Sequence, residues 1–148
     1  MSNTRLYDDL IMDHIKNARN YRRLDEVDRQ ATGMNPLCGD EVFVCLKMEG
    51  ERIADVAFQC TCCGISMASA SIMTEMVKGK LAHEAKALVR DCVAILRSRT
   101  QSSSHGMSAE RRAMLEMVKK FPARTRCAAL PWATLEGALD QQEAILVR

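Results

Sequence analysis

The fold is decided by the stretch Phe58–Lys78, which reads FQCTCCGISMASASIMTEMVK. It begins as the end of a strand, places three cysteines within four positions, and continues as a helix rich in Ala, Ser and Met. Backbone N–H groups and the helix dipole at a helix start stabilise thiolates and lower thiol pKa values. We therefore expect metal or sulfur chemistry here, and we expect two other segments to meet it, Asn35–Asp40 and Phe121–Cys127.

The bulk composition predicts one globular domain covering residues 1–148, since 47% of the residues are hydrophobic and 27% are charged. The 21 basic and 19 acidic side chains leave a formal charge of +2, too small to attract nucleic acid or an anionic membrane. One Trp, two Tyr and three Phe offer little for base stacking. The composition thus predicts neither a nucleic-acid nor a membrane partner.

The N-terminal sequence MSNTRLYDDL carries both charge signs and has no apolar core of signal-peptide length. No apolar run approaches the length of a membrane helix, so we expect a cytoplasmic protein. Seven cysteines in a reducing compartment argue against a disulfide framework, and their odd number leaves at least one unpaired. Metal binding or thiol chemistry is then the leading explanation for clustered cysteines.

Hydrophobic periodicity predicts an α+β fold with a small three-stranded antiparallel sheet and about five helices. Helices are expected over 4–16, 65–78, 81–97, 108–120 and 127–146. Strands are expected over 29–34, 41–49 and 53–59, and the last two of these strands should pair as a hairpin. The first strand is expected at an edge of the sheet, and residues 99–105 are expected to form a loop. Pro131 is expected in the first turn of the last helix, where no N–H is needed. The hairpin brings Asp40 beside Cys62 and Cys63.

The cysteines fall into two groups by their surroundings. Cys45 and Cys92 occupy apolar-periodic positions, which predicts buried and inert thiols. Cys38, Cys63 and Cys127 lie instead at junctions, beside Gly, Pro or Arg. Thiols at the ends of loops are free to act as ligands or nucleophiles.

The turn Cys38-Gly39-Asp40 offers a thiolate and a carboxylate, and its glycine allows the backbone to bend so that the two converge. Together with Cys63 and Cys127, this set suits tetrahedral zinc or one end of an iron–sulfur cluster. Around a divalent metal it carries two excess negative charges, which Arg124 and Arg126 are placed to offset. The gaps of 25 and 64 residues between the cysteines match no zinc-finger pattern, so spacing alone does not decide for a metal.

Four segments of the chain resemble the U-type iron–sulfur cluster assembly proteins, the family of IscU, SufU and the N-terminal part of NifU, and most closely its SufU branch. They are LYDDLIMDHIKNARN (6–20), MNPLCGDEV (34–42), CCGISMASASIMTEMVKGK (62–80) and FPARTRCAALPWATLEGAL (121–139). The resemblance spans nearly the whole chain. It implies an α+β domain whose small sheet is covered by helices on one side, in agreement with the periodicity.

Carried over by position, the resemblance implies that the metal or cluster ligands are Cys38, Asp40, Cys63 and Cys127, with Arg124 as electrostatic support. The implied cofactor is Zn²⁺, or alternatively iron or a [2Fe-2S] cluster. IscU-like members have a histidine before the last cysteine and an LPPVK chaperone motif, whereas this chain has arginine and FPART. These departures, and the long insert between residues 80 and 121, favour a zinc site that accepts sulfur.

The implied function is that of a zinc-dependent sulfurtransferase in iron–sulfur cluster assembly. It would take persulfide sulfur from a pyridoxal-phosphate cysteine desulfurase of the SufS type and serve downstream assembly proteins. We expect Cys38 to be the sulfur acceptor, because Pro36 and Gly39 place it on an isolated loop. The alternatives are a scaffold on which a [2Fe-2S] cluster is built and released, and a structural zinc domain.

Cys60 and Cys62 are additional thiols at positions where the SufU branch usually has none. Cys60 continues the face of Val56 and Phe58, so we expect it to pack in the core. For Cys62 the sequence leaves two roles open, a spare ligand or a resolving thiol.

Overall fold

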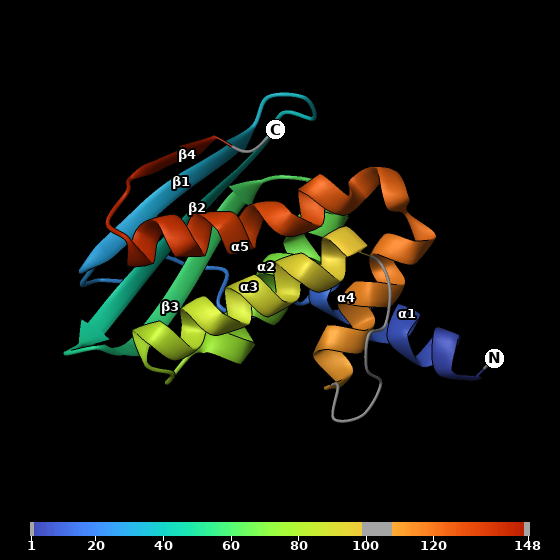
Figure 1. The fold of residues 1–148 in the computed structure, drawn as a ribbon, viewed down its shortest axis with the longest axis horizontal. Helices are drawn as coiled ribbons and strands as arrows, with labels where there is room; N and C mark the ends of the chain where they lie inside the picture. The colour runs from blue at the N-terminus through green and yellow to red at the C-terminus, as the bar shows by residue number, and fades with distance from the viewer. Residues whose placement is uncertain (1, 99–107, 147–148) are drawn as a thin grey trace.

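The computed structural model describes residues 2–98 and 108–146, so the loop expected over 99–105 lies outside the described residues (Figure 1). The fold is α+β, as predicted. Its elements, in chain order, are α1 (Ser2–Lys16), β1 (Arg29–Asn35), β2 (Asp40–Glu49), β3 (Arg52–Thr61), α2 (Gly64–Val77), α3 (Ala82–Ser98), α4 (Ala109–Lys120), the 3₁₀ turn η1 (Pro122–Arg124), α5 (Thr125–Leu139) and β4 (Ala144–Leu146). Ser108 caps α4, accepting a hydrogen bond from the Arg111 amide at 3.2 Å.

The sheet has four strands in the order β3-β2-β1-β4 in the described part of the chain, not three as predicted. The last helix ends at Leu139 rather than Leu146, and residues 144–146 pair parallel to β1, which is therefore not an edge strand. The chain reverses through Gln141, which has a positive φ of 60°. Ile145 then packs on Gly137, where an added Cβ would lie 2.5 Å from its side chain. The short apolar run after this turn fits a strand as well as a helix, so periodicity alone misassigned it.

The predicted hairpin of β2 and β3 is present. Its turn is Gly50-Glu51, and Gly50 has the positive φ (61°) that two-residue hairpin turns require. Glu41 pairs with Thr61, so Asp40 and Cys62 leave the ladder at the same end of the sheet. The hairpin thereby delivers a carboxylate and two cysteines to one place.

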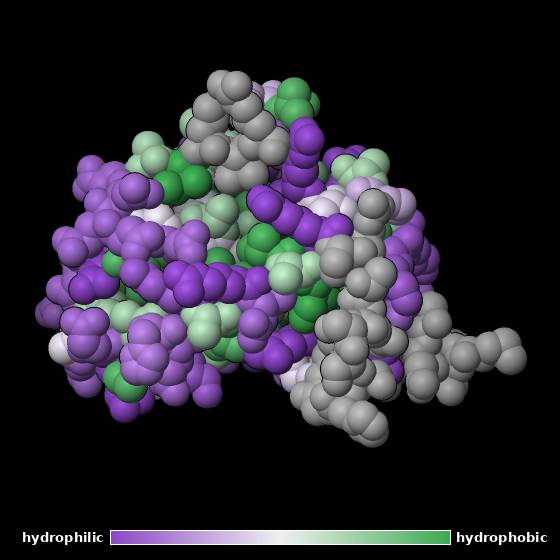
Figure 2. Space-filling model, viewed as in Figure 1, coloured by the Kyte–Doolittle hydropathy of each residue, from purple (hydrophilic) through white to green (hydrophobic). Residues whose placement is uncertain are grey.

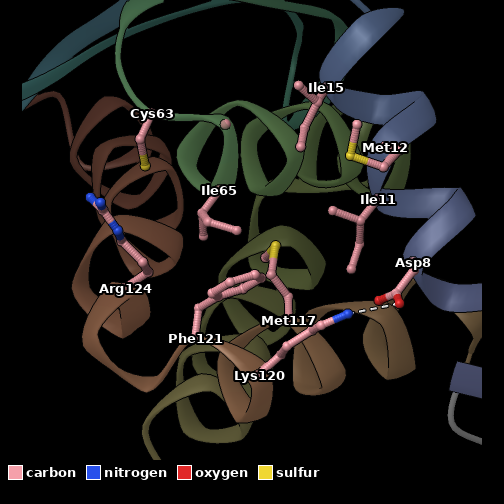
Figure 3. Close-up of a pocket in the computed structure, with 11 residues that line it drawn as sticks. Asp8, Ile11, Met12, Ile15, Cys63, Ile65, Met117, Lys120, Phe121 and Arg124 are labelled. Atoms are coloured by element: carbon pink, nitrogen blue, oxygen red, sulfur yellow. Dashed lines mark hydrogen bonds and ion pairs between the residues drawn. The ribbon is translucent and has the colours of Figure 1, made fainter.

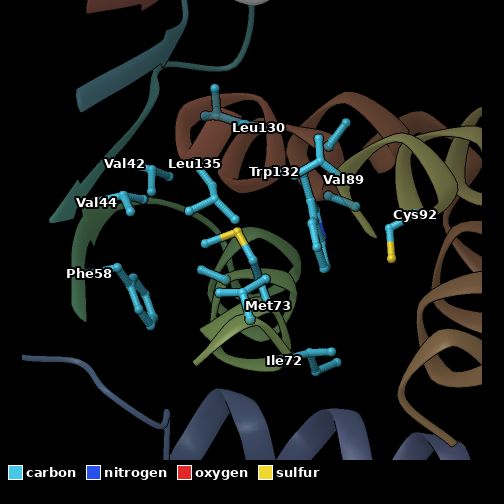
Figure 4. Packing of buried hydrophobic residues seen from close by; sticks show 14 of the residues in the cluster. Val42, Val44, Phe58, Ile72, Met73, Val89, Cys92, Leu130, Trp132 and Leu135 are labelled. Carbon is cyan, nitrogen blue, oxygen red and sulfur yellow. The ribbon is translucent and has the colours of Figure 1, made fainter. Parts of the chain in front are cut away.

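Helix α2 lies at the centre of the molecule, seen nearly end-on in Figure 4 with α5, the sheet, α1 and α3 around it. Nine of its residues are buried: Ser66, Ala68, Ser69, Ala70, Ser71, Ile72, Met73, Thr74 and Val77. Small side chains let neighbouring elements approach closely, while Ile72 and Met73 fill the core together with Phe58 and Trp132. A helix buried on most sides explains why the segment is apolar all round rather than amphipathic.

Helix α5 crosses β1 in close contact. A Cβ at Gly33 would lie 1.8 Å from Thr134 Oγ1, so only glycine allows this approach. The helix begins at Thr125, and Pro131 is therefore its seventh residue, not a first-turn residue as expected. Because proline lacks an N–H, the carbonyl of Cys127, four residues earlier, has no helical donor. This carbonyl lies at the candidate site described below.

The surface facing the viewer in Figure 2 is mainly hydrophilic, with apolar side chains in separate small groups. No helix among the described residues has the length and apolar character needed to cross a bilayer. Cys45 and Cys92 are buried, as predicted, and burial raises the pKa of both thiols, that of Cys92 to about 12. Both are therefore protonated, inert core residues.

Candidate metal centre

Cys38 lies on the exposed connection between β1 and β2. The amide of Leu37 donates to Asn35 Oδ1 at 3.0 Å, which tightens the turn, and Gly39 has a φ of +76° that bends the chain into β2. Leu37 is 71% exposed, so the tip of the connection carries little packing. The turn presents the Cys38 thiol at the surface directly before Asp40, the first residue of β2.

Three of the four predicted ligands meet at this end of the hairpin. The ligand atoms of Cys38, Asp40 and Cys127 lie within 4.8 Å of one another, and the Cys127 and Cys38 sulfur atoms are 3.5 Å apart. Asp40 and Cys127 are buried, whereas Cys38 is exposed. Cys127 comes from the first turn of α5, so an exposed turn and a packed helix each contribute one thiol.

The fourth predicted ligand, Cys63, lies close to this group but outside it. It is the half-buried N-cap of α2. Its sulfur is 3.8 Å from the hydroxyl of Ser66, which is in turn 2.8 Å from Asp40 Oδ2. One hydroxyl group therefore separates Cys63 from the carboxylate of the cluster.

Ser66 also reaches the carbonyl that Pro131 leaves free. Its hydroxyl lies 2.8 Å from the Cys127 oxygen, so one buried side chain joins α2 to both β2 and α5. Ser66 is not among the site residues predicted from the sequence. Two features of the sequence indicate its role in hydrogen bonding at the cluster. Ser66 follows Cys63 by about one helical turn, and Pro131 follows Cys127 by four residues, which leaves the Cys127 carbonyl without a helical donor.

Burial is the main reason that the pKa of the Cys127 thiol is raised, to about 12. The hydrogen bond to Cys38 and the negative charges of Cys63, Cys38 and Asp40 act in the same direction. This is the opposite of the lowered thiol pKa expected at a helix start. The position of Cys127 at the helix start therefore affects its pKa less than its burial and its anionic neighbours, both of which favour the protonated thiol.

Arg124 is the basic residue that contacts the cluster. Its pKa is raised first by a hydrogen bond to the Cys127 side chain, and further by the charges of Cys63, Cys127 and Asp40. Arg126, the other candidate, is exposed and lines a different pocket beside Cys38. The guanidinium of Arg124 is thus placed to offset the negative charge of a thiolate cluster.

Two pockets flank the cluster. One, of about 550 Å³, is mainly apolar and lies between α1, the start of α2 and the end of α4; Figure 3 shows Cys63 and Arg124 at one end and the Asp8–Lys120 ion pair at the other. The other, of about 750 Å³, is lined by Cys38 and Cys127 and by polar groups including Arg97 and Arg126. The second pocket therefore reaches the cluster at Cys38 and Cys127, and the first reaches the neighbouring Cys63 and Arg124.

Cys60 and Cys62 form a disulfide, which corrects two expectations. The chain was not expected to contain disulfides, and Cys60 was expected to serve only in core packing. Cys60 is half-buried and does pack against the core, but the chain bends as it leaves β3 and brings the two cysteines together. The remaining five cysteines are free.

The fold and this site define a class of small α+β protein that presents a cysteine–carboxylate cluster where a hairpin meets two helix starts. The family model described as the NifU-like N terminal domain matches residues 6–128. The chain belongs to this family, which includes the SufU and IscU proteins.

Individual relatives agree with this assignment. The chain is 36% identical to the zinc-dependent sulfurtransferase SufU of Bacillus subtilis, covering 93% of this chain and 92% of that protein. It is 34% identical to the iron–sulfur cluster assembly scaffold protein IscU 1 of Archaeoglobus fulgidus, covering 78% of each. A crystal structure of a protein proposed as an assembly scaffold for the SUF system of Fervidobacterium islandicum superposes with a TM-score of 0.77 at 31% identity, covering 88% of this chain and 93% of that one.

Proposed function

We propose that this protein works in iron–sulfur cluster assembly as a zinc-bound acceptor of persulfide sulfur. Cys38, Asp40, Cys63 and Cys127 hold the metal, and a pyridoxal-phosphate cysteine desulfurase of the SufS type supplies the sulfur. The observation that carries the proposal is the grouping of Cys38, Asp40 and Cys127 within 4.8 Å, with Cys38 alone exposed. The similarity to a zinc-dependent sulfurtransferase supports it.

The donor set fits zinc. Two thiolates bound tetrahedrally at ~2.3 Å lie about 3.8 Å apart, and the Cys38 and Cys127 sulfur atoms are separated by 3.5 Å. A carboxylate completes the kind of S and O ligand set that zinc accepts, and Arg124 lies beside the resulting excess negative charge. Zinc, when bound, keeps its ligand thiols deprotonated.

Sulfur transfer is assigned to Cys38. Its thiolate attacks the outer sulfur of the donor's persulfide, the new bond forms at Cys38 Sγ, and the donor leaves as a thiolate. Cys38 lies on an exposed turn and can move without disturbing the core, whereas Cys127 is buried at a helix start. Arg124 stabilises the negative charge that remains on the cluster. In this role residues 1–148 act as one cytoplasmic domain that serves downstream iron–sulfur assembly proteins.

A second candidate function is that of a scaffold that builds and releases a [2Fe-2S] cluster. The similarity to IscU scaffold proteins favours it, and the same four residues would hold the cluster. Metal analysis of the purified protein discriminates the two. Stoichiometric colourless zinc supports the sulfur acceptor, and stable visible absorption after reconstitution with iron and sulfide, without bound zinc, supports the scaffold.

A further inference from the structure

The disulfide of Cys60 and Cys62 has no part in the function proposed so far. The two Cα atoms are 5.4 Å apart, although residues two apart in a regular strand are separated by about 6.6 Å. The shortening arises where β3 ends at Thr61 and the chain turns toward α2. Both side chains are half-buried, so the pair is within reach of solvent and of small reactants.

A structural role explains this disulfide poorly. It joins residues only two apart, and the stabilisation that a disulfide gives through the unfolded chain increases with the length of the loop it closes. Cys60 is already held in the ladder opposite Val42. The Tyr21 hydroxyl also donates to the Cys60 carbonyl at 3.1 Å and lies 3.4 Å from its amide nitrogen. The backbone at Cys60 therefore stays in place whether or not the sulfur atoms are bonded.

The location of the pair indicates a chemical role. The ladder of β2 and β3 ends with Glu41 opposite Thr61, so Cys62 and Asp40 follow at the same end. Cys62 directly precedes Cys63, and Cys38 is two residues before Asp40. A dithiol thus lies at the margin of the cluster that would carry a persulfide, adjacent in sequence to the proposed ligand Cys63 and on a segment separate from Cys38 and Cys127.

We propose that Cys60 and Cys62, in their reduced form, are an internal reductant that converts a persulfide on Cys38 into hydrogen sulfide. This inference rests on the proposed function, which supplies the persulfide. The disulfide in the structure is the oxidised product of the reaction, and the chemical class of the substrate is a protein persulfide.

The reaction has two balanced steps. The Cys62 thiolate attacks the outer sulfur of the Cys38 persulfide, a new persulfide forms on Cys62, and Cys38 leaves as a thiolate. The Cys60 thiolate then attacks Cys62 Sγ, the Cys60–Cys62 disulfide forms, and hydrosulfide leaves and takes a proton from water. The sulfane sulfur gains two electrons, and the two thiolates lose them. A dithiol reductant, itself oxidised to a disulfide, restores the pair by thiol–disulfide exchange.

The test follows sulfur through one turnover. Fully reduced protein, freed of reductant, is incubated with an active desulfurase and L-cysteine; sulfide is measured, and persulfides are trapped by alkylation. Trypsin divides these thiols among three peptides: residues 30–47 carry Cys38 and Cys45, residues 53–78 carry Cys60, Cys62 and Cys63, and residues 127–148 carry Cys127. Fragmentation of each peptide in the mass spectrometer then identifies the modified cysteine. The wild type is expected to release about one sulfide for each Cys60–Cys62 disulfide formed.

Two variants show at which step the reaction stops, and a third serves as the control. Cys62→Ser is expected to keep its persulfide on Cys38 in peptide 30–47, whereas Cys60→Ser is expected to carry it on Cys62 in peptide 53–78. Neither releases sulfide above the level of the desulfurase alone. Cys45→Ala, which removes a buried thiol of peptide 30–47, behaves as the wild type.

The inference is overturned if Cys38 becomes persulfidated in the wild type while Cys60 and Cys62 stay reduced and no sulfide appears. It is also overturned if the double variant Cys60→Ser/Cys62→Ser releases as much sulfide as the wild type. Absence of a Cys38 persulfide in Cys62→Ser instead counts against the proposed function. In that case glutathione persulfide replaces the desulfurase: one sulfide per disulfide formed supports the reductant, and none overturns it.

Discussion

The hydroxyl of Ser66 lies 2.8 Å from a carboxylate oxygen of Asp40, so a buried hydrogen bond joins α2 to β2 inside the ligand cluster. The hydroxyl oxygen of Ser66 is also 2.8 Å from the carbonyl oxygen of Cys127. Since a hydroxyl has one proton, Ser66 donates to only one of these acceptors at a time. Ser66 therefore orients a predicted ligand, Asp40, and couples it to the backbone of another.

Ser66→Ala is expected to weaken zinc binding by about 10–100-fold, because groups that orient metal ligands typically have effects of this size. It should also lower the free energy of unfolding by about 1–3 kcal/mol, since buried acceptors lose their donor. Competition with a chelator of known affinity measures the first effect, and urea unfolding measures the second.

Ser69→Ala is the matched control for this change. Ser69 lies on the same helix, is also buried, and contacts the Ala128 carbonyl and Trp132 rather than the cluster. It should lose stability to a similar extent and keep its zinc affinity. Equal loss of zinc affinity in both variants would contradict the orienting role of Ser66.

Removal of a predicted ligand tests the metal set. Cys63→Ala and Cys127→Ala should each lose most of the bound metal and unfold at lower urea concentration, because three ligands remain. Metal content is measured by elemental mass spectrometry. Cys92→Ala removes a buried thiol far from the set and should keep full metal occupancy at a packing cost of about 1–2 kcal/mol. Full occupancy in either ligand variant would rule out the four-ligand assignment.

Arg124 contacts the Cys127 side chain and lies near the other anionic groups of the cluster. Arg124→Met should therefore reduce zinc affinity, because the excess negative charge of the bound site loses its nearest cation. Arg126→Met, at a position that is likewise exposed but lines the other pocket, is expected to have a much smaller effect. The same chelator competition at two salt concentrations compares the variants, and equal effects would show that only the net charge of the segment matters.

The buried environment of His14 leads to a prediction of how the free energy of unfolding depends on pH. It is buried, its Nδ1 is 2.7 Å from Ser71 Oγ, and burial, together with the charge of Arg19, holds its pKa below the ordinary value of 6.5, although Glu75 opposes this shift. Just below pH 6.5, His14 is therefore protonated to a greater extent in the unfolded chain than in the folded protein. The contribution of His14 is complete above pH 6.5 and is lost as the pH falls below that value.

His14→Gln should remove this part of the pH dependence. Urea unfolding at pH 7.5 and 5 is expected to show a smaller loss of stability on acidification in the variant than in the wild type. An equal or larger loss in the variant would contradict a neutral buried His14.

Most of what positions the cluster could be predicted from local patterns. Alternation along β2 and the two-residue turn at Gly50 fixed the register that brings Asp40 to the end of β3. The Ala and Ser residues of α2 are typical of a helix in close contact with its neighbours, and Ser66, Ala68, Ser69, Ala70 and Ser71 are all buried. The resemblance to the family supplied the proposed ligand set, and the structure places Cys38, Asp40 and Cys127 of that set within 4.8 Å of one another.

The remainder depends on contacts between distant segments. β4 could not be distinguished from a helix end, because its pairing with β1 rather than its composition decides its conformation. The hydrogen bond from Ser66 to Cys127 arises only where α2 meets α5. The pairing of Cys60 with Cys62 depends on the shortened backbone at Thr61, the last residue of β3, and regular strand geometry would have kept these two cysteines farther apart.

The most direct test of the account is to locate the sulfur after reaction with a desulfurase. The protein is incubated with the enzyme and cysteine, trapped by alkylation, digested with trypsin and analysed by mass spectrometry, using Cys62→Ser so that the persulfide accumulates. The account predicts a persulfide on Cys38, and it predicts that Cys38→Ser abolishes stimulation of the desulfurase even where metal stays bound. Persulfide on Cys63 or Cys127 with Cys38 unmodified, or none on any cysteine beside an active desulfurase, would contradict it.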